Sequence, residues 1–310
     1  MSNHTFKEWF LATRPWSFPA SAMPVAVTMA YCFYLTSSGD SAPVGPSQWA
    51  YSIVALISMI LFQAVGNVWS DLRDFKRGVD TADSYGVKIL TSGQFSTTEV
   101  RNLAIALFCI TSSLGVLLAV CCGPVILALG IAGIALTVFY PFLKYNALGD
   151  VDIFLTYALL PTAGTSYLIT GTFVPEAIAI SVPVGLITVA ILHANNTRDV
   201  ATDRRAGIRT LAMIIGNRAS RTVYVAEVVL PLAITGALIL SGILPAVAAV
   251  ACAAALLPTV RNIRMIAHAT PDNLISIGNL DEHTAKLQLV FSLSLSVALT
   301  LYAILLSHTS

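Results

Sequence analysis

The chain contains 310 residues, of which 56% are hydrophobic and only 11% are charged, whereas about 25% of the residues in a typical soluble domain are charged. This composition excludes a disordered tail, a small secreted protein and almost any soluble enzyme. The formal net charge of +1 gives no acidic or basic imbalance of the kind that accompanies nucleic-acid binding. We therefore expect a protein that crosses the membrane several times.

The first 17 residues, MSNHTFKEWFLATRPWS, are amphipathic and contain a proline but no small-residue cleavage site. They do not have the pattern of a signal peptide. We predict an interfacial helix that leads into the first membrane span.

A membrane-spanning helix needs about 20 mainly apolar residues. Nine segments meet this requirement, and together they predict an all-α integral membrane protein. The predicted spans lie near residues 17–37, 48–68, 100–121, 123–142, 151–171, 177–197, 222–241, 243–262 and 286–307.

Five cysteines lie in apolar parts of the sequence, at positions 32, 109, 121, 122 and 252. They form no C-x-x-C pair, and no histidine stands at ligand spacing from them. They are typical of small buried hydrophobic residues and support neither a disulfide framework nor a zinc site.

Positive charge is confined to one side of the predicted bundle. Every Lys and Arg lies in the N-terminal tail, in the connections after spans two, four, six and eight, or at the adjacent helix ends. The opposite connections, near residues 38–46, 123, 171–175 and 241, contain none. The positive-inside rule then puts the N-terminus and the charged loops in the cytoplasm, and nine spans put the C-terminus outside.

Acidic and amide side chains gather in two clusters on this charged side. The first follows span two and contains Asn67, Asp71 and Asp74, with Lys76 and Arg77 just beyond. Asn and Asp are separated by four residues, and Asp74 follows Asp71 by three. These spacings place the side chains on one face of a helix.

The second cluster follows span six and repeats the Asn-x-x-x-Asp spacing in Asn195 and Asp199, which hints at an ancient duplication. Asp203 adds a further step of four residues. The remaining members of the cluster are Asn196, Arg198, Arg204, Arg205 and Arg209.

Carboxylate and amide oxygens are the ligands that Mg²⁺ prefers, and Mg²⁺ commonly completes its coordination with substrate phosphate oxygens. Neighbouring Lys and Arg side chains would neutralise those phosphates. Because both clusters lie at the ends of apolar helices, the ligand should combine a lipid tail with a charged head, as an isoprenyl diphosphate does. The alternative is that the clusters only anchor loops and set the topology.

These residues resemble the UbiA superfamily of intramembrane aromatic prenyltransferases. The pattern Asn67-x-x-x-Asp71-x-x-Asp74 is similar to its first aspartate-rich motif, and Asp199-x-x-x-Asp203 to its second. The most similar branch is the 1,4-dihydroxy-2-naphthoate polyprenyltransferases of menaquinone synthesis (the MenA branch). The resemblance extends over about residues 13–217 and includes Arg14-Pro15 and the segments 76–81, 195–199 and 207–212.

The resemblance implies a single domain over residues 1–310, with the helices around a central cavity that has a cap on the cytoplasmic side. It assigns catalytic roles to Asn67, Asp71, Asp199 and Asp203, and Mg²⁺ binding to these four together with Asp74. Phe75 stands where the first motif often has its second aspartate, so either Asp74 or Asp80 completes the first metal site. The predicted substrate-binding residues are Arg14, Lys76, Arg77, Tyr140, Lys144, Asn195, Asn196, Arg198, Arg204 and Arg209.

Some positions keep two interpretations. Tyr140 and Lys144 either approach the diphosphate or the carbocation, or form an interfacial aromatic with a lysine that extends to the surface. His193 either faces a quinone precursor or is satisfied by a backbone partner. Asp150 and Asp152 at the start of span five are also typical of a helix N-terminal cap.

The implied reaction is Mg²⁺-dependent transfer of a polyprenyl group from polyprenyl diphosphate to 1,4-dihydroxy-2-naphthoate, with release of CO₂ and diphosphate. The reaction would take place in the cell's inner (cytoplasmic) membrane. The lipid bilayer is an expected partner, and nucleic acid is not. Two alternatives remain: another aromatic acceptor, such as 4-hydroxybenzoate or homogentisate, and a secondary transporter. The Asp-Gly-x-x-Ala-Arg core of CDP-alcohol phosphotransferases is absent from the sequence.

Overall fold

The computed structural model describes residues 4–78, 89–270 and 273–309. In these ranges the elements are helical, and two residues, Asn146 and Arg209, form an isolated parallel bridge. The longer elements are α2 (Phe18–Ser38), α3 (Pro46–Lys76), α4 (Thr97–Cys122), α5 (Pro124–Tyr145), α7 (Leu160–Thr170), α8 (Pro175–Arg198), α10 (Leu211–Leu240), α11 (Ala249–Ala267) and α12 (Leu280–Thr309). The shorter ones are α1 (Phe6–Ala12), η1 (Pro15–Ser17), α6 (Gly149–Phe154), η2 (Leu155–Leu159), α9 (Val200–Arg205), η3 (Ala246–Ala248) and η4 (Leu274–Ile277).

Within the described ranges, nine helical segments are long and apolar enough to cross a membrane, which confirms the predicted all-α bundle. Several helices continue beyond the apolar runs. α3 extends to Lys76, α10 already begins at Leu211 with a non-helical residue at Gly216, and α12 begins at Leu280. Helix propensity and hydrogen bonding carry a helix past the hydrocarbon layer, whereas a hydropathy criterion stops at its edge. The first acidic cluster therefore lies on one uninterrupted helix.

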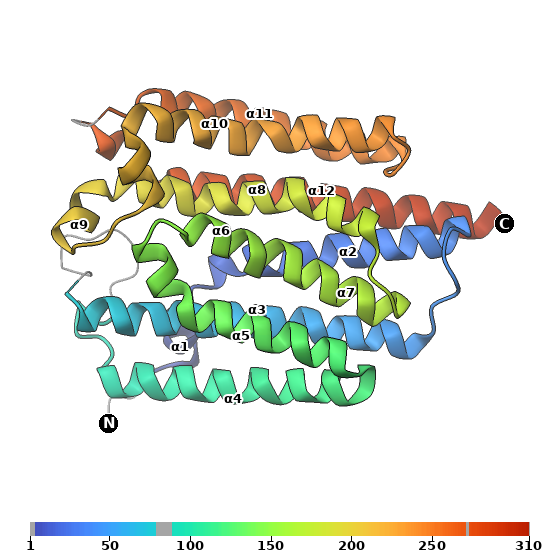
Figure 1. The fold of residues 1–310 in the computed structure, drawn as a ribbon, viewed down its shortest axis with the longest axis horizontal. Helices are drawn as coiled ribbons and strands as arrows, with labels where there is room; N and C mark the ends of the chain where they lie inside the picture. The colour runs from blue at the N-terminus through green and yellow to red at the C-terminus, as the bar shows by residue number, and fades with distance from the viewer. Residues whose placement is uncertain (1–3, 79–88, 271–272, 310) are drawn as a thin grey trace.

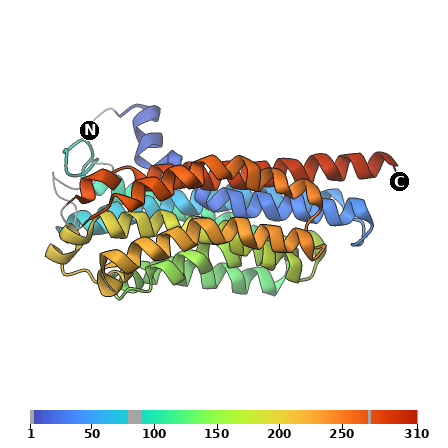
Figure 2. The ribbon, with the colours of Figure 1, turned by 90° about the horizontal axis from the view of Figure 1, so that it is seen from above.

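The long helices run side by side along one axis, with the C-terminus at one end (Figure 1). The helix ends that carry the described Lys and Arg side chains lie at the opposite end, together with the N-terminus and α9. α1 stands outside the bundle at this charged end (Figure 2). It starts at a capping box between Thr5 and Glu8, and it leaves Phe6 and Phe10 exposed, as an interfacial helix requires.

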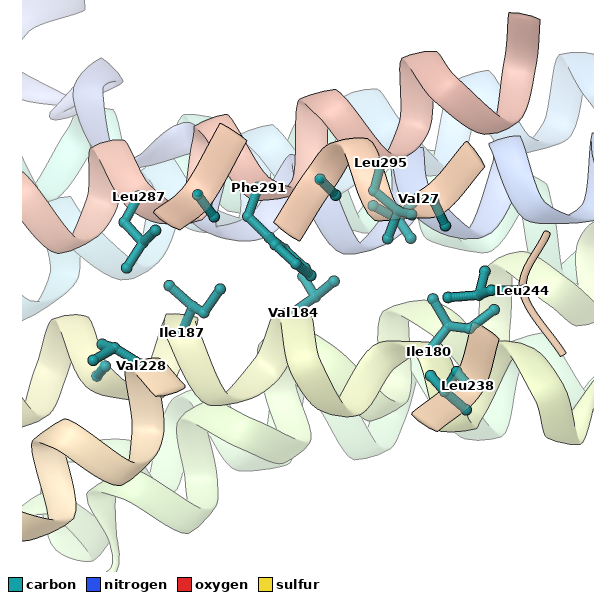
Figure 3. Packing of buried hydrophobic residues seen from close by; sticks show 14 of the residues in the cluster. Val27, Ile180, Val184, Ile187, Val228, Leu238, Leu244, Leu287, Phe291 and Leu295 are labelled. Carbon is teal, nitrogen blue, oxygen red and sulfur yellow. The ribbon is translucent and has the colours of Figure 1, made fainter. Parts of the chain in front are cut away.

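The largest core joins α2, α8, α10 and α12, and α12 packs against both α2 and α8. Figure 3 shows Ile187 and Val184 of α8 facing Leu287 and Phe291 of α12. On another side of α8, Gly185 allows close packing, because a Cβ atom there would lie 2.6 Å from the Cβ of Ala158 and 2.7 Å from the Cε2 of Phe154. This contact fixes α8 against α6 and η2, which both border the cavity described below.

The outside of the bundle is apolar. Leu240 is 90% exposed, Leu257 80% and Val120 79%, all on long helices. Exposed apolar patches of this extent are rare on soluble monomers. With lipid as the surrounding solvent these side chains are in a favourable environment, which supports a multi-pass membrane protein.

Candidate active site

A cavity of about 620 Å³ lies between the helices at the charged end of the bundle. Its walls come from residues 14–20, the C-terminal parts of α3, α5 and α8, the α6–η2 segment, α9 and the start of α12. The two acidic clusters thus border one cavity although 128 residues separate Asn67 from Asn195. The predicted site residues that line it are Arg14, Asn67, Asp74, Tyr140, Lys144, Asn195, Asn196, Arg198, Asp199 and Asp203.

Asn67 connects α3 to the N-terminal segment. Its Nδ2 donates to the carbonyl oxygen of Thr13 at 2.9 Å and to Oγ of Ser17 at 2.8 Å. Its Oδ1 accepts from Nε2 of Gln63 at 3.1 Å. The amide is therefore fixed in orientation by three hydrogen bonds, and it holds the segment that precedes α2 against the cavity.

Asp71 is 4% exposed and forms an ion pair with Arg14. It is not among the residues that line the cavity, whereas Arg14 is. Arg14 adopts the left-handed backbone conformation, with φ 56° and ψ 60°, which is uncommon for a residue other than glycine and has an energetic cost. The turn at Arg14 directs its guanidinium to Asp71, so the first motif is completed by a residue 57 positions earlier in the chain.

Asp74 lines the cavity and accepts two hydrogen bonds. Oδ1 accepts from the hydroxyl of Tyr145 at 3.1 Å, and Oδ2 accepts from Oγ of Ser70 at 3.3 Å. The guanidinium of Arg77 lies 5.1 Å from the centre of the Tyr145 ring, within the range of a cation–π interaction. Tyr145 therefore contacts both Asp74 and Arg77. Asp80 lies outside the described residues.

Asp199 stands where α8 ends and α9 begins. Arg198 donates from Nε to its Oδ1 at 2.7 Å and from Nη2 to its Oδ2 at 2.8 Å. This is the bidentate geometry that a guanidinium forms with a carboxylate. The carboxylate of the second motif is thus oriented by its immediate neighbour in sequence.

Asp203, one helical turn further on, is 6% exposed. Burial raises the pKa of its carboxyl to about 6, and the negative charges of Asp199 and Asp74 act in the same direction. Lys144 and Arg198 oppose this rise in the pKa. Burial, more than repulsion between carboxylates, is therefore the main cause of the raised pKa of Asp203.

The wall opposite α9 comes from α5 and the segment that follows it. Tyr140 and Lys144 line the cavity near the end of α5, and Asp152 of α6 lines it too. Oδ1 of Asp152 is buried without a hydrogen-bond partner. Thr156 and Tyr157 follow in η2, a five-residue π-helical turn. Such turns occur frequently at functional sites because they re-aim side chains within a helix.

Five predicted site residues do not line the cavity: Asp71, Lys76, Arg77, Arg204 and Arg209. The four cations among them are exposed at the same end of the bundle. They contribute to the electrostatic potential at the cavity rather than to its wall.

His193 is completely buried and does not line the cavity. Its Nε2 lies 2.9 Å from Oγ of Ser220, and its Nδ1 lies 3.3 Å from Oε1 of Glu227 and 3.5 Å from Oδ2 of Asp150. This cluster joins α6, α8 and α10 inside the bundle. The neighbours of the His193 ring are therefore side chains, whereas the sequence predicted either a backbone partner or a contact with a quinone precursor.

The start of α12 contributes cavity residues that the sequence reasoning missed. Asp281, Glu282 and Ala285 line the cavity, as does Gly278 just before the helix. The sequence contains one local signal: Asp281 and Glu282 directly precede an apolar span on the charged side. Asp152 likewise lies at the start of an apolar span on the charged side, but the sequence favoured a helix cap for it.

The side chains present suit a divalent cation that prefers oxygen ligands. Carboxylates approach the cavity from α3, α6, α8–α9 and α12. In the described part of the chain, no three His, Cys, Asp or Glu side chains converge as a preformed metal site. Mg²⁺ keeps several waters and uses one or two carboxylates together with substrate phosphates, so carboxylates of this kind could hold it.

A membrane bundle with an acidic, arginine-lined cavity at one end is the arrangement expected of a protein that binds a charged group attached to a lipid tail. Comparison with known proteins agrees with this class. The UbiA prenyltransferase family matches residues 25–280. The chain therefore belongs to the UbiA prenyltransferase family.

Relatives named UbiA prenyltransferase domain-containing protein 1 are found in several animals. The Xenopus tropicalis protein is 32% identical over 234 residues, covering 72% of this chain and 64% of its own length. The Danio rerio protein is 31% identical over 222 residues, covering 70% of this chain and 63% of its own length. The match thus spans less than two thirds of each relative, and the names do not specify an aromatic acceptor.

Solved structures share the fold. The apo structure of a UbiA homolog from Aeropyrum pernix K1 superposes with a TM-score of 0.66 at 16% identity, covering 90% of this chain and 97% of that one. A UbiA homolog from Archaeoglobus fulgidus, bound to DMAPP and Mg²⁺, gives a TM-score of 0.58 at 17% identity, covering 92% and 99%. At these identities the similarity concerns the helical architecture.

Proposed function

We propose that this chain is a Mg²⁺-dependent prenyltransferase that moves a polyprenyl group from polyprenyl diphosphate to an aromatic ring. The observation that carries the proposal is the convergence of residues from both acidic clusters, three cations and several apolar side chains on one cavity at the end of a membrane bundle. Membership in the UbiA prenyltransferase family supports the reaction class. The Archaeoglobus fulgidus homolog bound to DMAPP and Mg²⁺ supports the ligand class.

In this proposal Asn67, Asp71, Asp74, Asp199 and Asp203 hold Mg²⁺ with its bound diphosphate. Mg²⁺ supplies charge stabilisation for the diphosphate as the allylic C–O bond breaks. Arg14, Lys144 and Arg198 lie at the cavity wall, where they would bind the remaining phosphate oxygens. Lys76, Arg77, Arg204 and Arg209 would attract the anionic substrate from the surface.

The interior part of the cavity must keep an allylic cation away from water. Tyr140, Tyr157 and Trp69 line the cavity, and their ring faces would stabilise positive charge. Phe139, the residue before Tyr140, is 60% exposed and is not among the residues that line the cavity. Ile153 and Ile191 complete an apolar lining beside the polar end, which suits a reaction that must exclude water.

For the acceptor we propose 1,4-dihydroxy-2-naphthoate, with CO₂ released as the prenyl group replaces the carboxylate. The support is the resemblance of Asn195-Asn196 and of Arg209-Thr210-Leu211 to the menaquinone branch. The confinement of the Lys and Arg residues to one side of the bundle supports an orientation with the cavity at the cytoplasmic side of the inner membrane. A secondary transporter is disfavoured, because transporter sites lie near the bilayer midplane, whereas these acidic residues gather at one end.

The test is prenyl transfer by the purified chain in detergent, with Mg²⁺, a polyprenyl diphosphate, and either 1,4-dihydroxy-2-naphthoate or 4-hydroxybenzoate. We expect product from the naphthoate only, abolished by EDTA and restored by Mg²⁺. Product from the benzoate alone would keep the reaction class and replace the acceptor. An intact diphosphate with both acceptors and saturating Mg²⁺ would contradict the proposed function.

A further inference from the structure

The wall formed by the start of α12 lies in the last third of the chain, where the sequence carries no recognised motif. Four residues of this region line the cavity: Gly278, Asp281, Glu282 and Ala285. One of them, Asp281, also contacts a residue of the second acidic cluster. Its Oδ2 lies 3.2 Å from Nη1 of Arg198.

Arg198 uses its guanidinium to bridge two elements. Nε and Nη2 bind both oxygens of Asp199, while Nη1 donates to the carbonyl oxygen of Gly278 at 3.0 Å and pairs with Asp281. The Arg198 side chain is only 7% exposed. A guanidinium is planar and presents its donors in fixed directions, so the contacts on one edge determine the direction of the other.

This geometry orients Asp199 without occupying all of its acceptor positions. A carboxylate has about four lone-pair sites, and a bidentate arginine takes two of them. The other two remain for a cation in the cavity. If the charge of Asp281 is removed, Nη1 loses a charged partner and keeps the neutral carbonyl of Gly278, so the Arg198 plane is held less firmly.

We propose that Asp281 is a positioning residue for the metal site: it fixes the guanidinium of Arg198, which in turn fixes the carboxylate of Asp199 toward the cavity. The inference rests on the proposed function in one respect, the assignment of Asp199 to Mg²⁺. It gives α12 a part in assembling the site, although the predicted metal ligands all come from α3 and from the end of α8 with α9.

The first experiment measures cation binding directly and needs no prenyl transfer. Trp16 and Trp69 line the cavity, so the intrinsic fluorescence of the full chain in detergent should report a titration with Mg²⁺ in the presence of inorganic diphosphate. We expect Asp281→Asn to raise the half-saturating Mg²⁺ concentration about 10- to 100-fold, the usual effect of removing a partner that orients a metal-binding carboxylate. Asp281→Glu, which keeps the charge, should shift it less.

The matched control is Asp40→Asn, the same chemical change in the connection between α2 and α3 at the opposite end of the bundle. It should titrate like the wild type. A titration of Asp281→Asn that matches the wild type would overturn the inference. If Asp281→Asn does not fold, Arg198→Lys carries the same expectation, because lysine keeps the charge and loses the bidentate contact.

The second measurement asks whether Asp281 acts through Arg198. In a double-mutant cycle, Asp281→Asn should add little to the Mg²⁺ shift already caused by Arg198→Lys. Full additivity would contradict the inference. In prenyl transfer, most of the kcat of Asp281→Asn should return at high Mg²⁺, which a general packing defect would not allow.

The two proposals fail in different ways. A wild-type chain that binds Mg²⁺ and diphosphate but transfers no prenyl group contradicts the proposed function and leaves the Asp281 comparison readable. A wild-type chain whose fluorescence does not respond to Mg²⁺ with diphosphate overturns the metal site and this inference together.

Discussion

Asn67 and Asp71 on α3 take their contacts from the N-terminal segment, whereas Arg198, the neighbour of Asp199 in sequence, ties the second cluster to α12. Asn67 binds Thr13 and Ser17, and Asp71 pairs with Arg14. Asp199 pairs with the adjacent Arg198, which reaches Gly278 and Asp281. Two stretches with the same spacing are therefore supported by opposite ends of the chain.

This difference teaches that spacing identifies the chemistry of a motif but not its surroundings. Asp199 borders the cavity, while Asp71 lies just behind the lining, with Arg14 as its partner. In the proposed mechanism Asp71 would have to release or share Arg14 in order to hold Mg²⁺. Asp199 can accept the cation while it keeps Arg198.

The largest effects should come from the two aspartates. We expect Asp199→Asn and Asp71→Asn each to lower kcat/KM for prenyl transfer by about 10³-fold, because each change removes a carboxylate that would hold the Mg²⁺ needed to stabilise the leaving diphosphate. Steady-state kinetics at several Mg²⁺ concentrations checks this. A loss for Asp71→Asn at least tenfold smaller than for Asp199→Asn would mean that Asp71 serves Arg14 and not the metal.

The arginines should separate the two motifs at an intermediate level. Arg198→Lys loses a two-point contact with Asp199, whereas the contact between Arg14 and Asp71 is made by Nη2. We expect about a 100-fold loss of kcat/KM for Arg198→Lys and about tenfold for Arg14→Lys, since a lysine replaces a single contact better than a bidentate one. Equal losses would show that the two pairs work alike.

The asparagines should differ in stability more than in activity. Asn67→Ala removes the hydrogen bonds to Thr13 and Ser17, which we expect to weaken the local stability of residues 5–17 by about 1–3 kcal/mol. Hydrogen exchange of that segment should then speed up. Asn195→Ala is the matched control and should leave exchange in residues 5–17 unchanged. Faster exchange there in both variants would contradict the assigned contacts.

The smallest change tests the support of Asp74. Tyr145→Phe removes one hydrogen bond to its Oδ1 and keeps the ring beside Arg77. A hydrogen bond to a charged group contributes about 1.5–3 kcal/mol, but Ser70 still binds the other oxygen. We expect a rise of about two- to tenfold in the Mg²⁺ requirement of prenyl transfer, with Ser70→Ala at the lower end. If Tyr145→Phe lowered kcat/KM for prenyl transfer more than Arg14→Lys does, this ranking would be overturned.

Some features could be predicted from sequence because they depend on neighbouring residues. Asn67 and Asp74 share a helix face with α-helical spacing, and the long apolar runs predict the spans. The ends of α3, α10 and α12 were placed too close to those runs, because charged residues continue a helix outside the hydrocarbon. The naphthoate acceptor and the orientation stay predictions.

The sequence by itself determined the membrane class, the all-α fold, the charged side and the residue types of the candidate site, because hydropathy and helical periodicity are local properties of a chain. Only the tertiary structure decided that Arg14 pairs with Asp71, that Asp152 and Asp281 border the cavity, and that His193 lies with Glu227 and Asp150 inside the bundle. Arg14 and Asp71 are 57 positions apart, His193 and Asp150 are 43 apart, and His193 and Glu227 are 34 apart. Such contacts depend on how the helices pack, and the spacing of residues along one helix carries no information about its neighbours.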